Sequence, residues 1–139
     1  MYQRQGKYAL AETYAAQALA GLRHVEGSDD PDTISETADL ALAYQSQKKF
    51  SESESLAREG VAGDRKMQPD NWQRFRAESL LGASLAGQKK YAEAEPLQLE
   101  GYQGMLARKE RIAAPDWYQL DLARGWIFQL YQLIIGLLG

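Results

Sequence analysis

One short phrase occurs three times in this sequence, at almost equal intervals. Gln-Gly-Lys-Tyr ends at Tyr8, Gln-Lys-Lys-Phe ends at Phe50 and Gln-Lys-Lys-Tyr ends at Tyr91, so the aromatic residues lie 42 and 41 residues apart. A fixed period of this length indicates a stack of similar structural units, in which each unit buries its apolar face against the next. The repeat therefore constrains the fold more than any other feature of the chain.

When the three copies are aligned on this aromatic residue, small residues align with small ones and large apolar residues with large ones. Small side chains allow two helices to approach closely, while large ones fill the grooves beside the contact. A column of glutamates also appears, and we interpret it as acidic residues in the first turns of helices rather than as catalytic pairs. The columns are Ala11, Ser53 and Ala94; Glu12, Glu54 and Glu95; Tyr14, Leu56 and Leu97; and Ala18, Gly60 and Gly101.

A Pro-Asp pair marks a boundary in each unit, at Pro31, Pro69 and Pro115. Proline at the first position of a helix, followed by an aspartate, is typical of a helix start. The apolar residues between these signals have helical spacing, and Pro96 is expected to cause only a local adjustment. We predict helices near 8–26, 32–47, 50–66, 70–87, 91–112 and 116–137, paired antiparallel as an A helix followed by a B helix.

The predicted units are approximately 1–30, 31–68, 69–114 and 115–139, within one domain of residues 1–139. The first and last units are incomplete in this prediction. Residues 2–7 form only the end of an A helix, and the A helix near 116–137 has no B helix after it.

Composition limits the function classes. Hydrophobic residues make up 45% of the 139 residues, which is enough for a core, and the net charge of −3 does not suggest a nucleic-acid partner. The absence of cysteine excludes disulfides and thiol chemistry. The apolar stretch from Trp126 to Leu138 is shorter than the roughly 20 residues of a membrane span. We therefore expect a cytoplasmic protein without a membrane span.

No residue pattern points to catalysis. His24 is the only histidine and has no candidate partner nearby in the sequence, so we expect neither a metal site nor a general base. No phosphate-binding, zinc-protease or serine-hydrolase motif is present. We expect a non-enzymatic protein without a cofactor, in which Trp72, Trp117 and Trp126 belong to the core.

The repeated unit resembles the tetratricopeptide repeat, in particular the long subtype of roughly 42 residues found in kinesin light chains and in many bacterial proteins. The matching segments are the corners 5–8, 47–50 and 88–91, the helix start 92–97 and the linker 27–33. This resemblance implies an all-α, right-handed superhelix of antiparallel helix pairs, with about three repeats. It also implies that the A helices line a concave face, which binds an extended peptide or a helix of a partner protein.

The family pattern assigns specific residues to this concave face. They give a small, neutral groove with a few amides, in which Arg76 either binds a carboxylate of a ligand or is only an exposed charge at a helix end. The paired asparagines with which the long subtype often binds a peptide backbone are absent, since Ala38-Asp39 and Ser79-Leu80 occupy those places. The expected concave residues are Ser35, Ala38, Leu42, Gln45, Arg76, Ser79, Ala83, Leu122, Gln129 and Gln132.

The apolar C-terminal segment suggests two further functions. Its aliphatic residues could pack against another molecule, which would make the chain a self-assembly unit, or the array could have been cut from a longer chain. A third hypothesis is a regulatory segment of a larger bacterial signalling protein. The expected self-association residues are Leu133, Ile134, Leu137 and Leu138.

Overall fold

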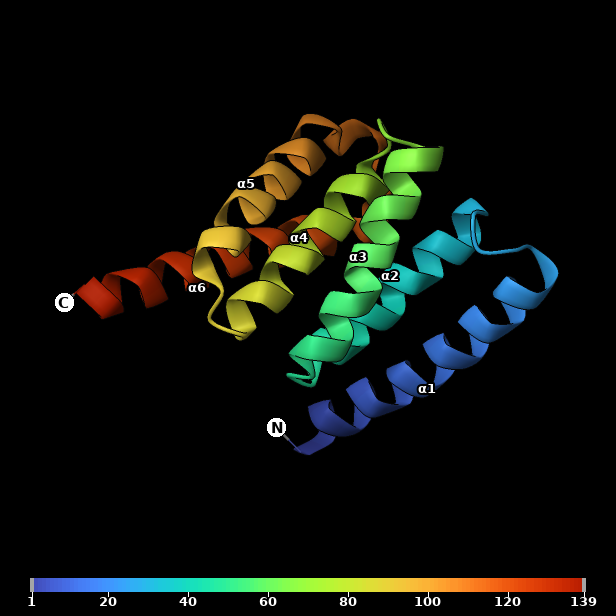
Figure 1. Ribbon diagram of the computed structural model, residues 1–139, viewed down its shortest axis with the longest axis horizontal. Coiled ribbons are helices and arrows are strands. Elements are labelled where there is room, and N and C mark those ends of the chain that lie inside the picture. Colours follow the sequence, from blue (N-terminus) through green and yellow to red (C-terminus); the bar gives the residue numbers. More distant parts are fainter. Residues whose placement is uncertain (1, 139) are drawn as a thin grey trace.

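The computed structural model describes residues 2–138, which contain six α-helices and no strand. Two antiparallel pairs form the centre: α2 (Pro31–Ser46) with α3 (Phe50–Met67), and α4 (Trp72–Gly87) with α5 (Tyr91–Ala107). Helix α1 (Tyr2–Val25) precedes them, and α6 (Tyr118–Leu138) follows two short 3-10 turns at Lys109–Arg111 and Ala114–Asp116. Figure 1 shows the helices stacked in chain order, with α6 crossing behind α4. The predicted all-α solenoid of helix pairs is confirmed.

The repeated phrase forms the corner between an A helix and its B helix. After α2, Lys49 N–H donates to the carbonyl of Tyr44 at 2.9 Å and Lys48 N–H donates to that of Gln45 at 3.0 Å. This double hydrogen bond is the Schellman motif, which needs one residue in the left-handed conformation. Lys48 takes that conformation with φ 62°, and Lys89 repeats it after α4 with φ 65°.

The first copy of the phrase does not form a corner. The prediction that residues 2–7 end an A helix and that a turn precedes Tyr8 is wrong, because α1 is continuous from Tyr2 to Val25. In the other two copies, the backbone N–H of the last lysine in the corner donates to a carbonyl of the A helix that precedes it, α2 or α4. In the first copy, the segment continues as helix through Gly6 and Tyr8.

Two of the three Pro-Asp pairs lie before the α-helix that we predicted them to begin. Pro31 is the first residue of α2, and its preceding Asp30 side chain caps the helix by accepting from Asp32 N–H at 2.9 Å. By contrast, α4 begins only at Trp72 with Asn71 as its cap, so Pro69 lies in the linker. Pro115 lies in a 3-10 turn before α6, and α5 ends at Ala107 rather than near residue 112. Pro96 lies inside α5, which remains one helix, as expected.

Two of the three aligned glutamates connect neighbouring units, and the prediction that the column serves helix N-termini is wrong. Glu54 accepts hydrogen bonds from Gln88 Nε2 at 2.8 Å and Lys90 Nζ at 3.5 Å, at the corner of the next unit. In the same way, Glu12 on α1 accepts from Gln47 and Lys49 at the corner between α2 and α3, at 2.8 and 3.0 Å. The residues in the first turns of α3 and α5 are Glu52 and Glu93 instead. We call these two sets of bonds the interunit glutamate contacts.

The core is centred on α4, in which every residue from Phe75 to Leu85 is buried. Glycines allow α5 to approach it closely, since a Cβ at Gly101 would lie 2.6 Å from the Phe75 carbonyl oxygen. Ser53 and Ala94, in the predicted column of small residues, are fully buried, whereas Ala11 on α1 is exposed. The column therefore marks close helix contacts only where an A helix packs against it.

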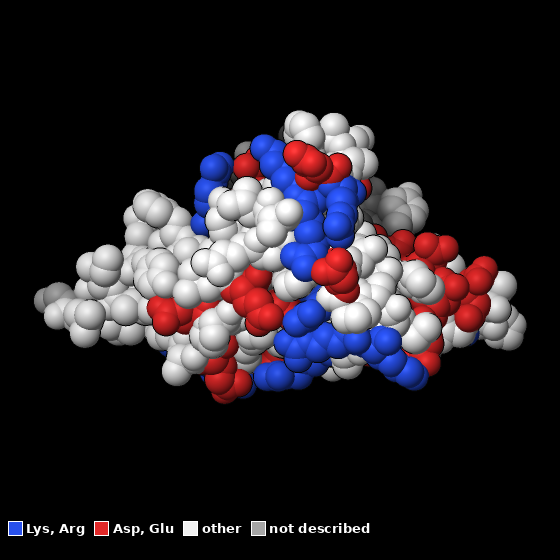
Figure 2. All heavy atoms as spheres, turned by 90° about the horizontal axis from the view of Figure 1, so that it is seen from above, with Lys and Arg blue, Asp and Glu red and all other residues white. Residues whose placement is uncertain are grey.

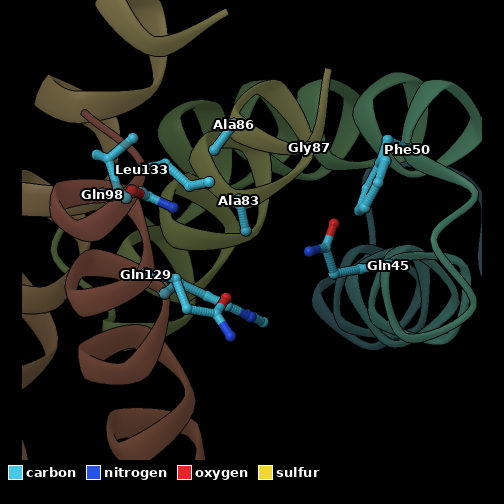
Figure 3. Close-up of a pocket in the computed structure, with 10 residues that line it drawn as sticks. Gln45, Phe50, Ala83, Ala86, Gly87, Gln98, Gln129 and Leu133 are labelled. Atoms are coloured by element: carbon cyan, nitrogen blue, oxygen red, sulfur yellow. The ribbon is translucent and has the colours of Figure 1, made fainter. Parts of the chain in front are cut away.

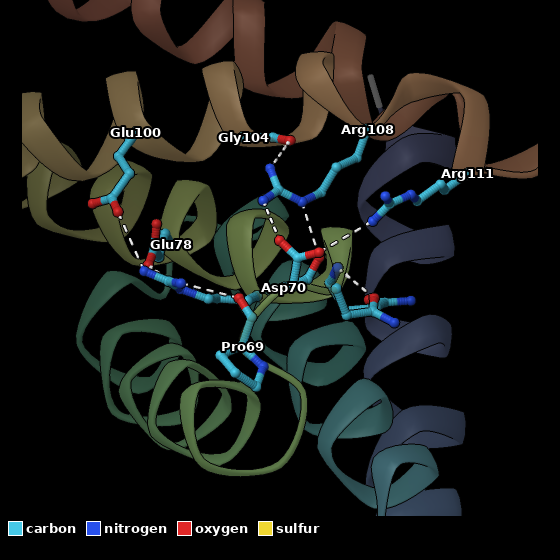
Figure 4. A network of polar contacts seen from close by, with 10 residues as sticks. Pro69, Asp70, Glu78, Glu100, Gly104, Arg108 and Arg111 are labelled. Atoms are coloured by element: carbon cyan, nitrogen blue, oxygen red, sulfur yellow. Dashed lines mark hydrogen bonds and ion pairs between the residues drawn. The ribbon is translucent and has the colours of Figure 1, made fainter.

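Ion pairs cover the outer edge of the repeat junction (Figure 4). Asp70 in the linker accepts from Arg108 and from Arg111, which hold the pKa of its carboxyl below the ordinary value. The buried Glu78 carboxylate accepts from Arg65 at 3.0 Å and from Arg74 at 3.1 Å. Seen from above, both signs of charge are interspersed on this side of the molecule (Figure 2). The linker is thus part of a polar network that joins successive units.

Candidate functional site

The A helices α2, α4 and α6 together line a pocket of about 170 Å³. Gln45 comes from α2, Ala83 from α4 and Gln129 from α6, and all three belong to the predicted concave face. Figure 3 shows Gln45 beside Phe50 on one side of the pocket and Gln129 on the other, with Ala83 between them. The other lining residues are Phe50, Ala86, Gly87, Gln98, Trp126, Leu130 and Leu133.

Three amide side chains border this otherwise apolar pocket. Gln45 Oε1 lies 3.3 Å from the Ser84 hydroxyl on α4, whose single proton has nearer acceptors, Ser53 Oγ at 2.6 Å and the Leu80 carbonyl at 2.9 Å. Gln98 is only 2% exposed, and its Oε1 has no hydrogen-bond partner within the described residues. Gln129 is exposed at the rim. Amides both donate and accept hydrogen bonds, as the main chain of a peptide does.

Acidic side chains and one arginine lie toward the N-terminal end of α2. Arg76 on α4 is 3% exposed and pairs with Asp39, while its second terminal nitrogen donates to Gln73 at 3.3 Å. Burial raises the pKa of Glu36 to about 7, and the hydrogen bond to Asp39 and the negative charge of Asp39 add to this effect. The Tyr118 hydroxyl on α6 also has a raised pKa, first because of its burial. This end of the groove is therefore unfavourable for an anionic ligand.

The structure brings only part of the predicted concave face to the surface. Ala38 and Ser79 are buried in the packing between helices, and Arg76 is buried and already paired with Asp39. We had expected Arg76 either to bind a ligand carboxylate or to be an exposed charge, and its burial contradicts the second expectation. Ser35, Leu42 and Leu122 are half-buried. Gln132 lies in a separate hollow with Tyr91 and Leu137, beside the corner between α4 and α5.

Sequence reasoning missed most of the residues that line the pocket, among them Phe50, Trp126 and Gln98. Phe50 is the repeated corner aromatic, which we had assigned only to the corner, and Trp126 had been assigned to the core. Trp126 does pack against the core cluster while also lining the pocket, and Trp72 packs against a second cluster as predicted. The assignment of Trp117 to the core is wrong, since it is 47% exposed. Gln98 belongs to a B helix, and no pattern in the sequence distinguishes it from an ordinary surface glutamine.

The predicted self-association residues lie on the second half of α6. Leu133, Leu137 and Leu138 are 50%, 73% and 85% exposed, whereas Ile134 is half-buried. Their neighbours Phe128 and Ile135 are exposed by 63% and 66%. The C-terminal end of α6 shows no charged side chain at the left of Figure 2. Within residues 2–138, no helix combines the length and the apolar character needed to cross a bilayer.

Comparison with known proteins supports one family. Residues 1–66 match the family model of the tetratricopeptide repeat. The match includes the corner between α2 and α3 and the interunit contact of Glu12. No curated protein matches the sequence significantly. The all-α stack of helix pairs agrees with this family, whose repeats are generally modules for protein–protein interaction.

Proposed function

We propose that this tetratricopeptide-type chain is a non-enzymatic interaction module, which binds an extended peptide or a helix of a partner protein in the groove between α2, α4 and α6. The observation that supports this most directly is that Gln45, Ala83 and Gln129, from three different A helices, line one pocket. The repeat spacing of 42 and 41 residues further supports the long, kinesin-light-chain-like subtype. A cytoplasmic location remains a prediction.

The charges near the groove favour some partners over others. Asp39 and Glu36 lie on α2 beside the groove, and the nearby Arg76 is already paired with Asp39. At neutral pH Glu36 is partly protonated and Asp39 is paired, so an acidic segment would meet no free cation at this end of the groove. We infer that the partner segment is neutral or basic, and we do not expect nucleic acid to bind.

Selection from a phage-displayed library of random 12-residue peptides tests this function. We expect selected peptides to lose about thirtyfold in affinity when Gln45 and Gln129 are both changed to alanine, since two lost hydrogen bonds of about 1 kcal/mol each add to about 2 kcal/mol. Gln103→Ala is the matched control, because Gln103 is exposed on α5 and lies outside the pocket. Peptides that bind the double variant and the original chain equally would contradict the groove assignment.

Self-association through α6 is the second candidate function, because several large apolar side chains are exposed on the second half of this helix. Changing Ile134 and Leu138 together to aspartate should convert a dimer into a monomer in sedimentation velocity. Gln132→Ala on the same helix should leave the mass unchanged. A chain that is monomeric at high concentration before any substitution would rule this candidate out.

A further inference from the structure

The pocket between α2, α4 and α6 has the size and lining of a site for a single side chain. Its volume is about 170 Å³, and Phe50, Trp126 and Leu133 supply apolar surface. For comparison, a cavity of about 150 Å³ lined by apolar side chains holds one benzene molecule. A six-carbon ring or a branched aliphatic side chain therefore matches the available space.

A buried amide side chain forms part of the pocket wall. Gln98 is 2% exposed and lines the pocket, and its Oε1 makes no hydrogen bond within the described residues. Its Cγ packs against Gly82, where an added Cβ would lie 2.5 Å from that atom, so the glycine makes room for Gln98 beside the pocket.

The two amides at the opening match the main chain that would flank such a side chain. Every residue of a peptide other than proline offers one N–H donor and one carbonyl acceptor. Figure 3 shows Gln45 and Gln129 on opposite sides of the opening, so one amide lies on each side of an inserted residue. The paired asparagines of the long subtype are absent from this sequence, and these glutamines offer the same kind of contact from different positions.

We propose that this pocket is a specificity site for one leucine or phenylalanine side chain of the bound peptide, with the flanking main chain hydrogen-bonded to Gln45 and Gln129. This inference rests on the proposed function and adds a requirement for the bound sequence. The groove selects a segment with an apolar residue at a fixed position and without acidic neighbours.

Capped single amino acids provide a direct probe. We expect N-acetyl-leucine N-methylamide and the phenylalanine equivalent to shift the side-chain NH₂ resonances of Gln98 and Gln129 saturably in NMR titrations at millimolar concentration. The alanine and aspartate equivalents should cause at least tenfold weaker responses. Equal responses to leucine and alanine, or no response to any probe, would overturn the proposal.

Two variants test the pocket independently of the probes. Ala83→Leu places a larger side chain in the pocket and should abolish the leucine response, with folding checked by circular dichroism. Gln129 is exposed, so Gln129→Ala should fold normally even if Ala83→Leu does not. We expect this variant to respond to the leucine probe about fivefold more weakly than the original chain. Gln132→Ala, on the same helix but outside the pocket, should respond like the original chain. An unchanged response in Gln129→Ala would contradict the amide contact.

The selected phage peptides separate this inference from the proposed function. Groove-dependent peptides without a fixed leucine or phenylalanine would contradict the pocket while leaving the interaction module intact. Peptides that are insensitive to Gln45 and Gln129 would contradict the interaction module itself.

Discussion

At the scale of single residues, glycine decides how closely α4 and α5 can approach. A Cβ at Gly101 would lie 2.6 Å from the Phe75 carbonyl oxygen and 2.7 Å from the Ser79 amide nitrogen. Both are backbone atoms of α4, so they cannot move away by a change of rotamer. The small residues in the repeat thus have a steric cause at this position.

Gly101→Ala is therefore expected to destabilise the fold by about 1–3 kcal/mol, the usual cost of overpacking. Gly21→Ala is the matched control, since a Cβ there would meet nothing within 4 Å and alanine favours a helix by about 0.5–1 kcal/mol over glycine. Urea unfolding followed by circular dichroism measures both. Equal stability of Gly101→Ala and the original chain would show that α5 shifts freely against α4.

Glu36 is the residue whose ionisation should influence stability near neutral pH. Its pKa is raised from 4.5 to about 7, so between these values the folded chain keeps a proton that the unfolded chain has released. The free energy of unfolding must then decrease as pH rises through this window. Because Glu36 is only half-buried, solvent screening should keep the slope below the limit of about 1.4 kcal/mol per pH unit for one proton.

Glu36→Gln should flatten this dependence, because glutamine does not titrate. Urea unfolding at several pH values from 4.5 to 8 measures the slope. Glu26→Gln is the control, since Glu26 is exposed just after α1 and its loss should leave the slope unchanged. A slope that is identical in Glu36→Gln and the original chain would refute the assignment.

At the scale of the helices, the interunit glutamate contacts join one pair to the next. Glu54 on α3 is bonded to Gln88 at the corner after α4, and Arg58 and Gln88 together lower the pKa of its carboxyl. Glu12 on α1 makes the equivalent contact with Gln47. The same bonds recur, so the polar residues of each corner are bound by a glutamate of the helix in the preceding unit.

A double-mutant cycle of Glu54→Ala and Gln88→Ala should give a coupling energy of about 0.5–1.5 kcal/mol, in the range of a partly buried hydrogen bond. Chemical unfolding of the four proteins measures it. The pair Glu54→Ala and Gln103→Ala should show no coupling, because Gln103 does not contact Glu54. Additive effects in the first pair would show that the contact adds nothing to stability.

At the scale of the whole molecule, burial decreases from α4 toward both ends of the stack. Phe75 to Leu85 are all buried, whereas Leu19 is the only fully buried residue among residues 6–25. In α6, residues 135–138 are exposed. Repeat proteins are stabilised mainly by contacts between neighbouring units, so stability should be distributed unevenly along the chain.

Native-state hydrogen exchange measured by NMR should reveal this distribution. We expect the backbone amides of residues 80–85 to exchange slowest, and those of 8–16 and 134–138 at least tenfold faster. The reason is that the end helices lose few buried contacts when they open. Uniform protection along the chain would instead indicate that all six helices unfold in one step.

The sequence by itself determined the features that depend on nearby residues. The period of the repeated phrase, the corners at Lys48 and Lys89 and the helix start at Pro31 follow from local hydrogen bonds and backbone conformation. The family resemblance also placed Gln45, Ala83 and Gln129 on one face, and the structure brings them to one pocket. Whether they bind a peptide stays a prediction.

Tertiary structure decided the features that depend on which helices cross. The burial of Arg76 and Ser79, the partners of Glu54 and the entry of Gln98 into the pocket all involve residues from different helices. The continuity of α1 through Gly6 was likewise not determined by the repeated phrase, which forms a corner in the other two copies. Local sequence sets how each segment coils, but the burial and the charge partners of a side chain are properties of contacts between segments distant in the chain.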